Sequence, residues 1–116
     1  HLVERHKDSV MELVMLGTGS PLPDPNRAGP SQLVGVDGRW FLVDAGRGCL
    51  MRLVAAGVGP VAIEQLLVTH LHSDHVTDVN DVITTRWIGG FPPASWTTRC
   101  GCWSLTWGGG WLTMTT

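Results

Sequence analysis

The sequence predicts an α/β fold, and three observations support that prediction. Short apolar runs typical of β-strands alternate with segments of helical periodicity between residues 11 and 93. The dipeptide Asp37-Gly38 separates two of the apolar runs, and Asp-Gly at such a place is the strongest short-range signal for a β-hairpin. Gly57 directly follows the first helical segment, where glycine commonly ends a helix.

Each element is predicted from its own pattern. The strand candidates are apolar runs bounded by turn residues, and the helix candidates carry one apolar stripe. Proline and glycine between the first two strands predict a long ordered loop. We expect Trp87 to lie in the core. The expected strands are Glu12–Leu16, Leu33–Val36, Trp40–Val43 and Leu66–Val68, the expected helices are Arg47–Ala56 and Asp78–Trp87, and the loop is Gly17–Arg27.

Length and composition exclude several classes of protein. The chain has 116 residues, a formal net charge of -2 and 43% hydrophobic residues, which favours one folded domain over a disordered chain. No apolar run approaches the ~20 residues that span a bilayer, so we expect no membrane partner. Near-neutral charge argues against a general nucleic-acid-coating protein. Three cysteines cannot close a disulfide framework, and the charged N-terminus lacks a signal core, so we expect a cytoplasmic protein.

The chain divides into three unlike parts. Residues 1–10 are polar, and we expect a disordered leader before Met11. Residues 11–93 carry the domain. Residues 94–116 form an atypical tail: its last 21 residues hold four of the six tryptophans, only one charged residue, Arg99, and no convincing period. This composition favours translation in a wrong reading frame, and the alternative is an ordinary Trp-rich tail.

The chemistry of the chain is concentrated in His70-Leu71-His72-Ser73-Asp74-His75, directly after a predicted buried strand. In an extended segment alternate residues point the same way, so His70 and His72 can face one point, and Asp74 and His75 a neighbouring one. Imidazole and carboxylate are ligands that zinc accepts, and α/β proteins place ligands at the carboxyl ends of strands. A solvated polar loop is the alternative reading, but this density of ligands favours a metal site.

This H-x-H-x-D-H motif resembles the signature of the metallo-β-lactamase superfamily. The opening Leu16-Gly17-Thr18-Gly19-Ser20 resembles the ribonuclease Z branch, and Trp40–Gly46 resembles the superfamily's strand that ends in Asp-x-Gly. Ser73 stands where ribonuclease Z enzymes commonly have glycine. The resemblance implies the first αβ half of an αββα sandwich, truncated and followed by an irregular tail rich in Trp, Thr and Gly. Residues 11–93 would then be a partial domain.

The same resemblance implies roles for five residues. His70 and His72 would ligate a first zinc ion, and Asp74 and His75 a second, with Asp74 also the catalytic proton acceptor and donor. Asp44 would hold the histidine loop by hydrogen bonds from outside the ligand shell. Its alternative role is a helix N-cap before Gly46. The family's downstream ligands are missing, because no histidine follows His75 and no acidic residue follows Asp81.

Three functions follow as hypotheses. The first is a ribonuclease Z-like zinc phosphodiesterase acting on precursor tRNA. The second is a hydrolase of small esters, lactones or sulfates. The third is an inactive truncated fragment that binds metal weakly. The resemblance leaves a homodimer of the full-length protein open.

Four weaker sequence features bear on other kinds of functional site. Gly17-x-Gly19 lacks the third glycine of a dinucleotide loop, and Cys100-x-Cys102 lacks the usual metal spacing. Cys49 is expected to be a packing residue rather than a nucleophile. Arg47 and Arg52 have the chemistry to touch phosphate, although isolated arginines are usually solvated.

Overall fold

The computed structural model describes residues 4–7, 11–89, 95–98, 104–108 and 111–115, with side chains for residues 11–89. These residues form an eight-stranded sheet in which the strands follow chain order. The two pairs β4–β5 and β5–β6 are parallel, and the other neighbouring strands are antiparallel. The elements are β1 (Glu4–Lys7), β2 (Met11–Gly17), β3 (Ser31–Val36), β4 (Arg39–Val43), α1 (Cys49–Ala55), the 3-10 turn η1 (Pro60–Ala62), β5 (Ile63–Val68), α2 (Ser73–Val76), α3 (Val79–Ile88), β6 (Ser95–Thr98), β7 (Ser104–Gly108) and β8 (Trp111–Thr115).

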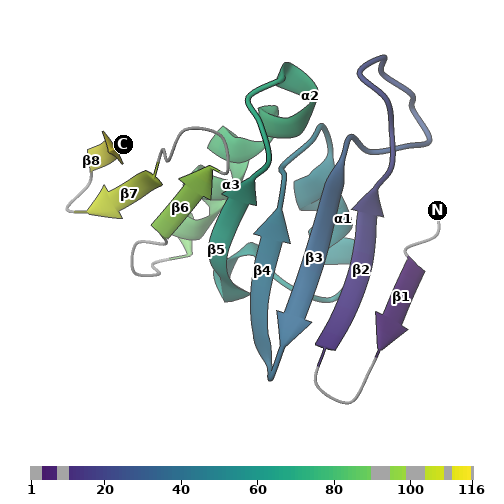
Figure 1. Cartoon of the computed structure of the whole chain (residues 1–116), viewed down its shortest axis with the longest axis horizontal. Helices are drawn as coiled ribbons and strands as arrows, with labels where there is room; N and C mark the ends of the chain where they lie inside the picture. Colours follow the sequence, from purple (N-terminus) through teal and green to yellow (C-terminus); the bar gives the residue numbers. More distant parts are fainter. Residues whose placement is uncertain (1–3, 8–10, 90–94, 99–103, 109–110, 116) are drawn as a thin grey trace.

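Helices α1 and α3 cover one face of the sheet, and α2 lies at the edge towards which β5 points (Figure 1). Alternate residues of a strand face opposite sides, and in β2 the side chains of Val14 and Leu16 are buried while Leu13 and Met15 are partly exposed. The helix-covered face therefore holds the core. Its buried residues are Val14, Leu16, Leu33, Leu42, Ala45, Cys49, Leu53, Val58, Ile63, Leu66, Val68 and Val82. This arrangement confirms the predicted α/β class.

Two predicted backbone signals are confirmed in detail. Asp37 and Gly38 both have positive φ, 51° and 79°, which a two-residue type I′ hairpin turn requires. At the end of α1, Gly57 has φ 81° and donates its N–H to the carbonyl of Val54 at 3.0 Å. Val58 donates to the carbonyl of Leu53 at 3.2 Å, which completes the paired bonds of a Schellman motif.

The helix boundaries and one core assignment differ from expectation. Helix α1 begins at Cys49 rather than Arg47, because Gly48 adopts φ 80° and cannot continue a right-handed helix. The core prediction for Trp87 was wrong: its side chain is 62% exposed. The neighbouring Arg86 turns inward instead, and its guanidinium donates to backbone carbonyls of η1 and of the first residue of β5.

Both ends of the chain also differ from expectation. Part of the expected disordered leader forms β1, antiparallel to β2, because an edge strand offers unpaired backbone groups to any extended segment. The expected irregular tail forms β6, β7 and β8, since threonine and tryptophan favour strands even without an alternating pattern. The domain boundaries themselves, and the frameshift, stay predictions. None of the described helices is long and apolar enough to cross a membrane.

Candidate metal centre

The histidine motif lies at the carboxyl end of β5, as predicted. The strand ends at Val68, and α2 begins at Ser73 inside the motif. Asp74 is buried, His70 and His75 are partly buried, and His72 is exposed. The cluster therefore has a side that solvent or a ligand can reach.

The structure brings the four predicted ligands together as two neighbouring pairs. Nε2 of His70 lies 3.0 Å from Nδ1 of His72. Nε2 of His75 lies 3.5 Å from Oδ2 of Asp74. The rings of His70 and His75 join the pairs, with their centroids 4.1 Å apart. The pairing is the one that the resemblance implied for two metal ions, and the role of each residue as a ligand stays a prediction.

Asp44 is the anchor of the cluster. Its carboxylate is buried and accepts hydrogen bonds from the backbone N–H of Thr69 at 2.8 Å and from Nδ1 of His75 at 2.8 Å. The Thr69 hydroxyl lies 2.8 Å from Oδ2 and 3.0 Å from Oδ1 of the same carboxylate. Asp44 is not a helix N-cap, because α1 begins at Cys49 with Gly48 as its N-cap. Its φ of 61° turns the chain sharply after β4 and aims the carboxylate at the motif.

These hydrogen bonds fix which imidazole nitrogens can bind a metal. Because Nδ1 of His75 donates to Asp44, its Nε2 keeps a lone pair facing Asp74. The Thr69 hydroxyl donates to Asp44 and accepts from Nδ1 of His70 at 3.0 Å, so Nε2 of His70 keeps a lone pair facing His72. One buried carboxylate thus orients two imidazoles, directly and through Thr69. The sequence analysis did not identify Thr69 as a residue that orients His70. Its hydroxyl, directly before His70 in the sequence, was the feature that could have indicated this role.

Close backbone packing holds the cluster against the loop after β2. A Cβ built on Gly46 would lie 2.7 Å from the carbonyl oxygen of Asp74 and 2.6 Å from the nitrogen of Pro30. Any side chain at Gly46 would therefore push α2 away from the loop. The backbone N–H of Ala45 also donates to the carbonyl of His75 at 2.9 Å. The Asp44–Gly46 segment positions α2 through both contacts.

The two pairs supply part of the ligand set that a divalent metal such as zinc needs. Zn–N bonds of about 2.0–2.1 Å separate two nitrogens on one tetrahedral ion by about 3.3 Å, close to the 3.0 Å between His70 and His72. Among residues 11–89 no three His, Cys, Asp or Glu side chains form a group that could hold one ion. Each described pair therefore supplies two ligands, fewer than the four of a closed zinc site.

Two further polar residues have structural roles. Cys49 is fully buried, and burial, assisted by the nearby Asp78 carboxylate, raises the pKa of its thiol to about 12. It is therefore a protonated packing residue, as predicted. Oδ2 of Asp78 accepts the backbone N–H of Leu50 at 3.2 Å, so Asp78 caps α1 rather than its own helix α3.

A family model described as Anti-Pycsar protein Apyc1 matches residues 11–89 of this chain. The chain belongs to this family. Among curated proteins, it is 61% identical over 84 residues to a ribonuclease Z of Mycolicibacterium paratuberculosis, covering 72% of this chain and 30% of the relative. A ribonuclease Z of Mycobacterium avium is 60% identical over 84 residues, with the same coverage. The chain thus spans about 30% of the length of these relatives.

Solved structures agree with the sequence relatives. The short form of human tRNase Z superposes with a TM-score of 0.64 at 28% identity, covering 69% of this chain and 31% of that chain. The metallo-β-lactamase fold protein YhfI of Bacillus subtilis gives a TM-score of 0.67 at 22% identity, covering 76% and 35%. These matches confirm the predicted metallo-β-lactamase fold over part of its length and the resemblance to the ribonuclease Z branch.

Proposed function

We propose that this chain is the N-terminal part of a metal-dependent hydrolase, a ribonuclease Z-like phosphodiesterase that processes the 3′ ends of precursor tRNA. The observation that carries the proposal is the cluster of two side-chain pairs at the end of β5, in which the single carboxylate of Asp44 orients His75 directly and His70 through Thr69. Relatives named ribonuclease Z support the substrate class. Because the chain spans about 30% of those relatives, the activity is proposed for the full-length protein.

We propose zinc as the metal, because imidazole and carboxylate dominate the donor set. His70 and His72 would hold one ion, and Asp74 and His75 the other. Bound zinc would lower the pKa of a water molecule and polarise the phosphoryl oxygen. Asp74 is buried, with Oδ2 facing His75. In this proposal its carboxylate would accept a proton and pass it to the leaving oxygen. We also propose that the protein acts in the cytoplasm, and that the full-length protein forms a homodimer.

A chimera tests the proposal directly. Residues 11–89 of this chain replace the matching segment of the Mycolicibacterium paratuberculosis relative, and the product is assayed on precursor tRNA with added zinc. We expect cleavage that Asp74→Ala abolishes. The matched control is Asp81→Ala, which removes an exposed carboxylate from the first turn of α3 and leaves cleavage unchanged.

Other outcomes distinguish the competing hypotheses. A folded, zinc-loaded chimera that leaves precursor tRNA uncut, while the intact relative cuts it, would overturn the proposal. Hydrolysis of small esters without any cleavage of RNA would favour the small-ester hydrolase. Catalysis by the 116-residue chain itself, abolished by Asp74→Ala, would eliminate the inactive-fragment hypothesis.

A further inference from the structure

The turn Asp44–Gly46, which carries the anchoring carboxylate, is held by a complete set of backbone hydrogen bonds. Asp44 is buried and has φ 61°, a conformation that a residue with a Cβ keeps only where its surroundings determine it. Each of the six backbone N–H and C=O groups in the turn has a partner at 2.8–3.1 Å. The partners are Leu67 and Ser31 for Asp44, His75 and Asp78 for Ala45, and Pro30 and Cys49 for Gly46. Segments distant in the chain therefore determine the conformation of this turn.

Ser31 makes the only one of these six bonds that comes from a side chain. It is the first residue of β3, it is 0% exposed, and its Oγ lies 2.8 Å from the carbonyl oxygen of Asp44. A serine hydroxyl has one proton, and here it is donated to this carbonyl. The other five partners are backbone groups. A substitution at Ser31 can therefore remove one support of the turn and leave the other five in place.

The Ser31 hydroxyl acts on the metal centre through a single peptide unit. The carbonyl of Asp44 and the N–H of Ala45 belong to the same planar peptide group. That N–H donates to the carbonyl of His75 at 2.9 Å, so Ser31 holds one end of the plane and the other end holds His75. Because the plane is rigid, a rotation that turns the carbonyl away from Ser31 also turns the N–H away from His75.

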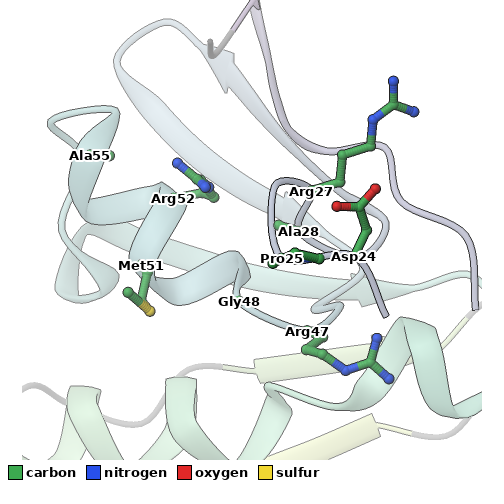
Figure 2. Close-up of a pocket in the computed structure, with 9 residues that line it drawn as sticks. All are labelled: Asp24, Pro25, Arg27, Ala28, Arg47, Gly48, Met51, Arg52 and Ala55. Carbon is green, nitrogen blue, oxygen red and sulfur yellow. The ribbon is translucent and has the colours of Figure 1, made fainter. Parts of the chain in front are cut away.

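The Asp44 carbonyl lies away from the open surface beside the turn. A pocket of about 420 Å³ opens between the loop after β2 and α1, and Figure 2 shows Arg47 and Gly48, which follow the turn, beside it. Neither Ser31 nor Asp44 lines this pocket, and Ala45 is 0% exposed. Without the serine hydroxyl the buried carbonyl would lose its hydrogen bond, and an unsatisfied buried carbonyl favours rotation of the peptide plane towards another donor.

We propose that Ser31 is a positioning residue for the metal centre. Its hydroxyl fixes the peptide unit between Asp44 and Ala45, and this unit sets the place of His75 relative to the Asp44 carboxylate. The inference rests on the proposed function and deepens it, because it names a core residue that prepares the site for metal. Ser31 acts through the turn and does not touch the reacting atoms.

The test measures amide hydrogen exchange and zinc affinity of the 116-residue chain, so that neither readout depends on cleavage. In Ser31→Ala we expect the N–H of Ala45 to exchange about 3–10-fold faster, while the N–H of Val82 in α3 exchanges as in the parent chain. Zinc affinity should fall by about 3–10-fold, less than the roughly 10–100-fold typical for loss of a direct partner of a ligand. Leu33→Val is the matched control: Leu33 is fully buried on the same face of β3, and both readouts should stay at the parent values.

The outcomes separate this inference from the proposed function. Equal acceleration of exchange at Ala45 and Val82 would show that Ser31→Ala lowers only global stability, and would overturn the inference. Zinc affinity equal to that of the parent chain would also overturn it, because the hydroxyl would then have no effect on the metal centre. If both readouts behave as expected while the chimera leaves precursor tRNA uncut, the proposed function fails alone. If the chimera cuts precursor tRNA and Ser31→Ala binds zinc like the parent chain, this inference fails alone.

Discussion

The orientation of His75 by Asp44 predicts the effect of a single-atom change, Asp44→Asn. The carboxylate accepts a backbone N–H from Thr69 on Oδ1 and Nδ1–H of His75 on Oδ2. An asparagine can supply an oxygen on only one side. Because the backbone N–H cannot change its role, the amide oxygen must face Thr69, and the NH2 group must face His75.

His75 must then reverse its tautomer in Asp44→Asn. Its Nδ1 becomes the acceptor, the proton moves to Nε2, and the lone pair that faces Asp74 is lost. Loss of such an orienting partner typically costs 10–100-fold in metal affinity, or about 1.4–2.8 kcal/mol. We therefore expect zinc affinity of the chain, measured by competition with a chromophoric chelator, to fall within that range.

Two controls accompany the measurement. Thr69→Ser keeps the hydroxyl between Asp44 and His70, so its zinc affinity should stay close to that of the parent chain. Nitrogen chemical shifts of the histidine rings report the tautomer directly. If Asp44→Asn bound zinc as tightly as the parent chain, or if His75 kept its proton on Nδ1, then Asp44 would not be the residue that fixes the tautomer of His75 for metal binding.

Three further predictions concern stability. Leu53→Ala should lower the free energy of unfolding in urea by about 2–5 kcal/mol, because Leu53 is fully buried between α1 and the sheet; a loss well under 1 kcal/mol would contradict that packing. Gly57→Ala should lower the free energy of unfolding by about 1 kcal/mol or more, since φ 81° strains any residue with a Cβ. Ala55→Gly, at an exposed helical position, is the control for the difference in helix propensity between alanine and glycine. The buried thiol of Cys49 has a pKa raised from 9.0 to about 12, so the unfolded chain releases this proton first as pH rises. Stability should therefore fall between about pH 9 and pH 12, and the fall should be smaller in Cys49→Ala; identical pH profiles for the two chains would exclude the effect.

The sequence determined the parts of this protein that depend on local chemistry. Asp37-Gly38 supplied both positive φ angles of the hairpin, and Gly57 ended α1, because these conformations depend on the residues themselves. The spacing of His70, His72, Asp74 and His75 was enough to predict that these side chains gather in two neighbouring pairs, since neighbours at a strand end can face only nearby points.

Tertiary structure decided what depends on residues distant in the chain. The hydrogen bond from His75 to Asp44 spans 31 positions, and only the folded chain shows that the Thr69 hydroxyl links Asp44 to His70. Arg86 turns inward where Trp87 was expected, because the carbonyls of η1 and β5 offer its guanidinium three acceptors. The strands at both ends of the sheet formed because the neighbouring strand presents unpaired backbone groups, which any sequence able to extend can satisfy. Local conformation depends on the residues of one segment, and the sequence of that segment predicts it. The hydrogen-bonding and packing partners of a residue come from distant segments, and only the folded chain brings them together.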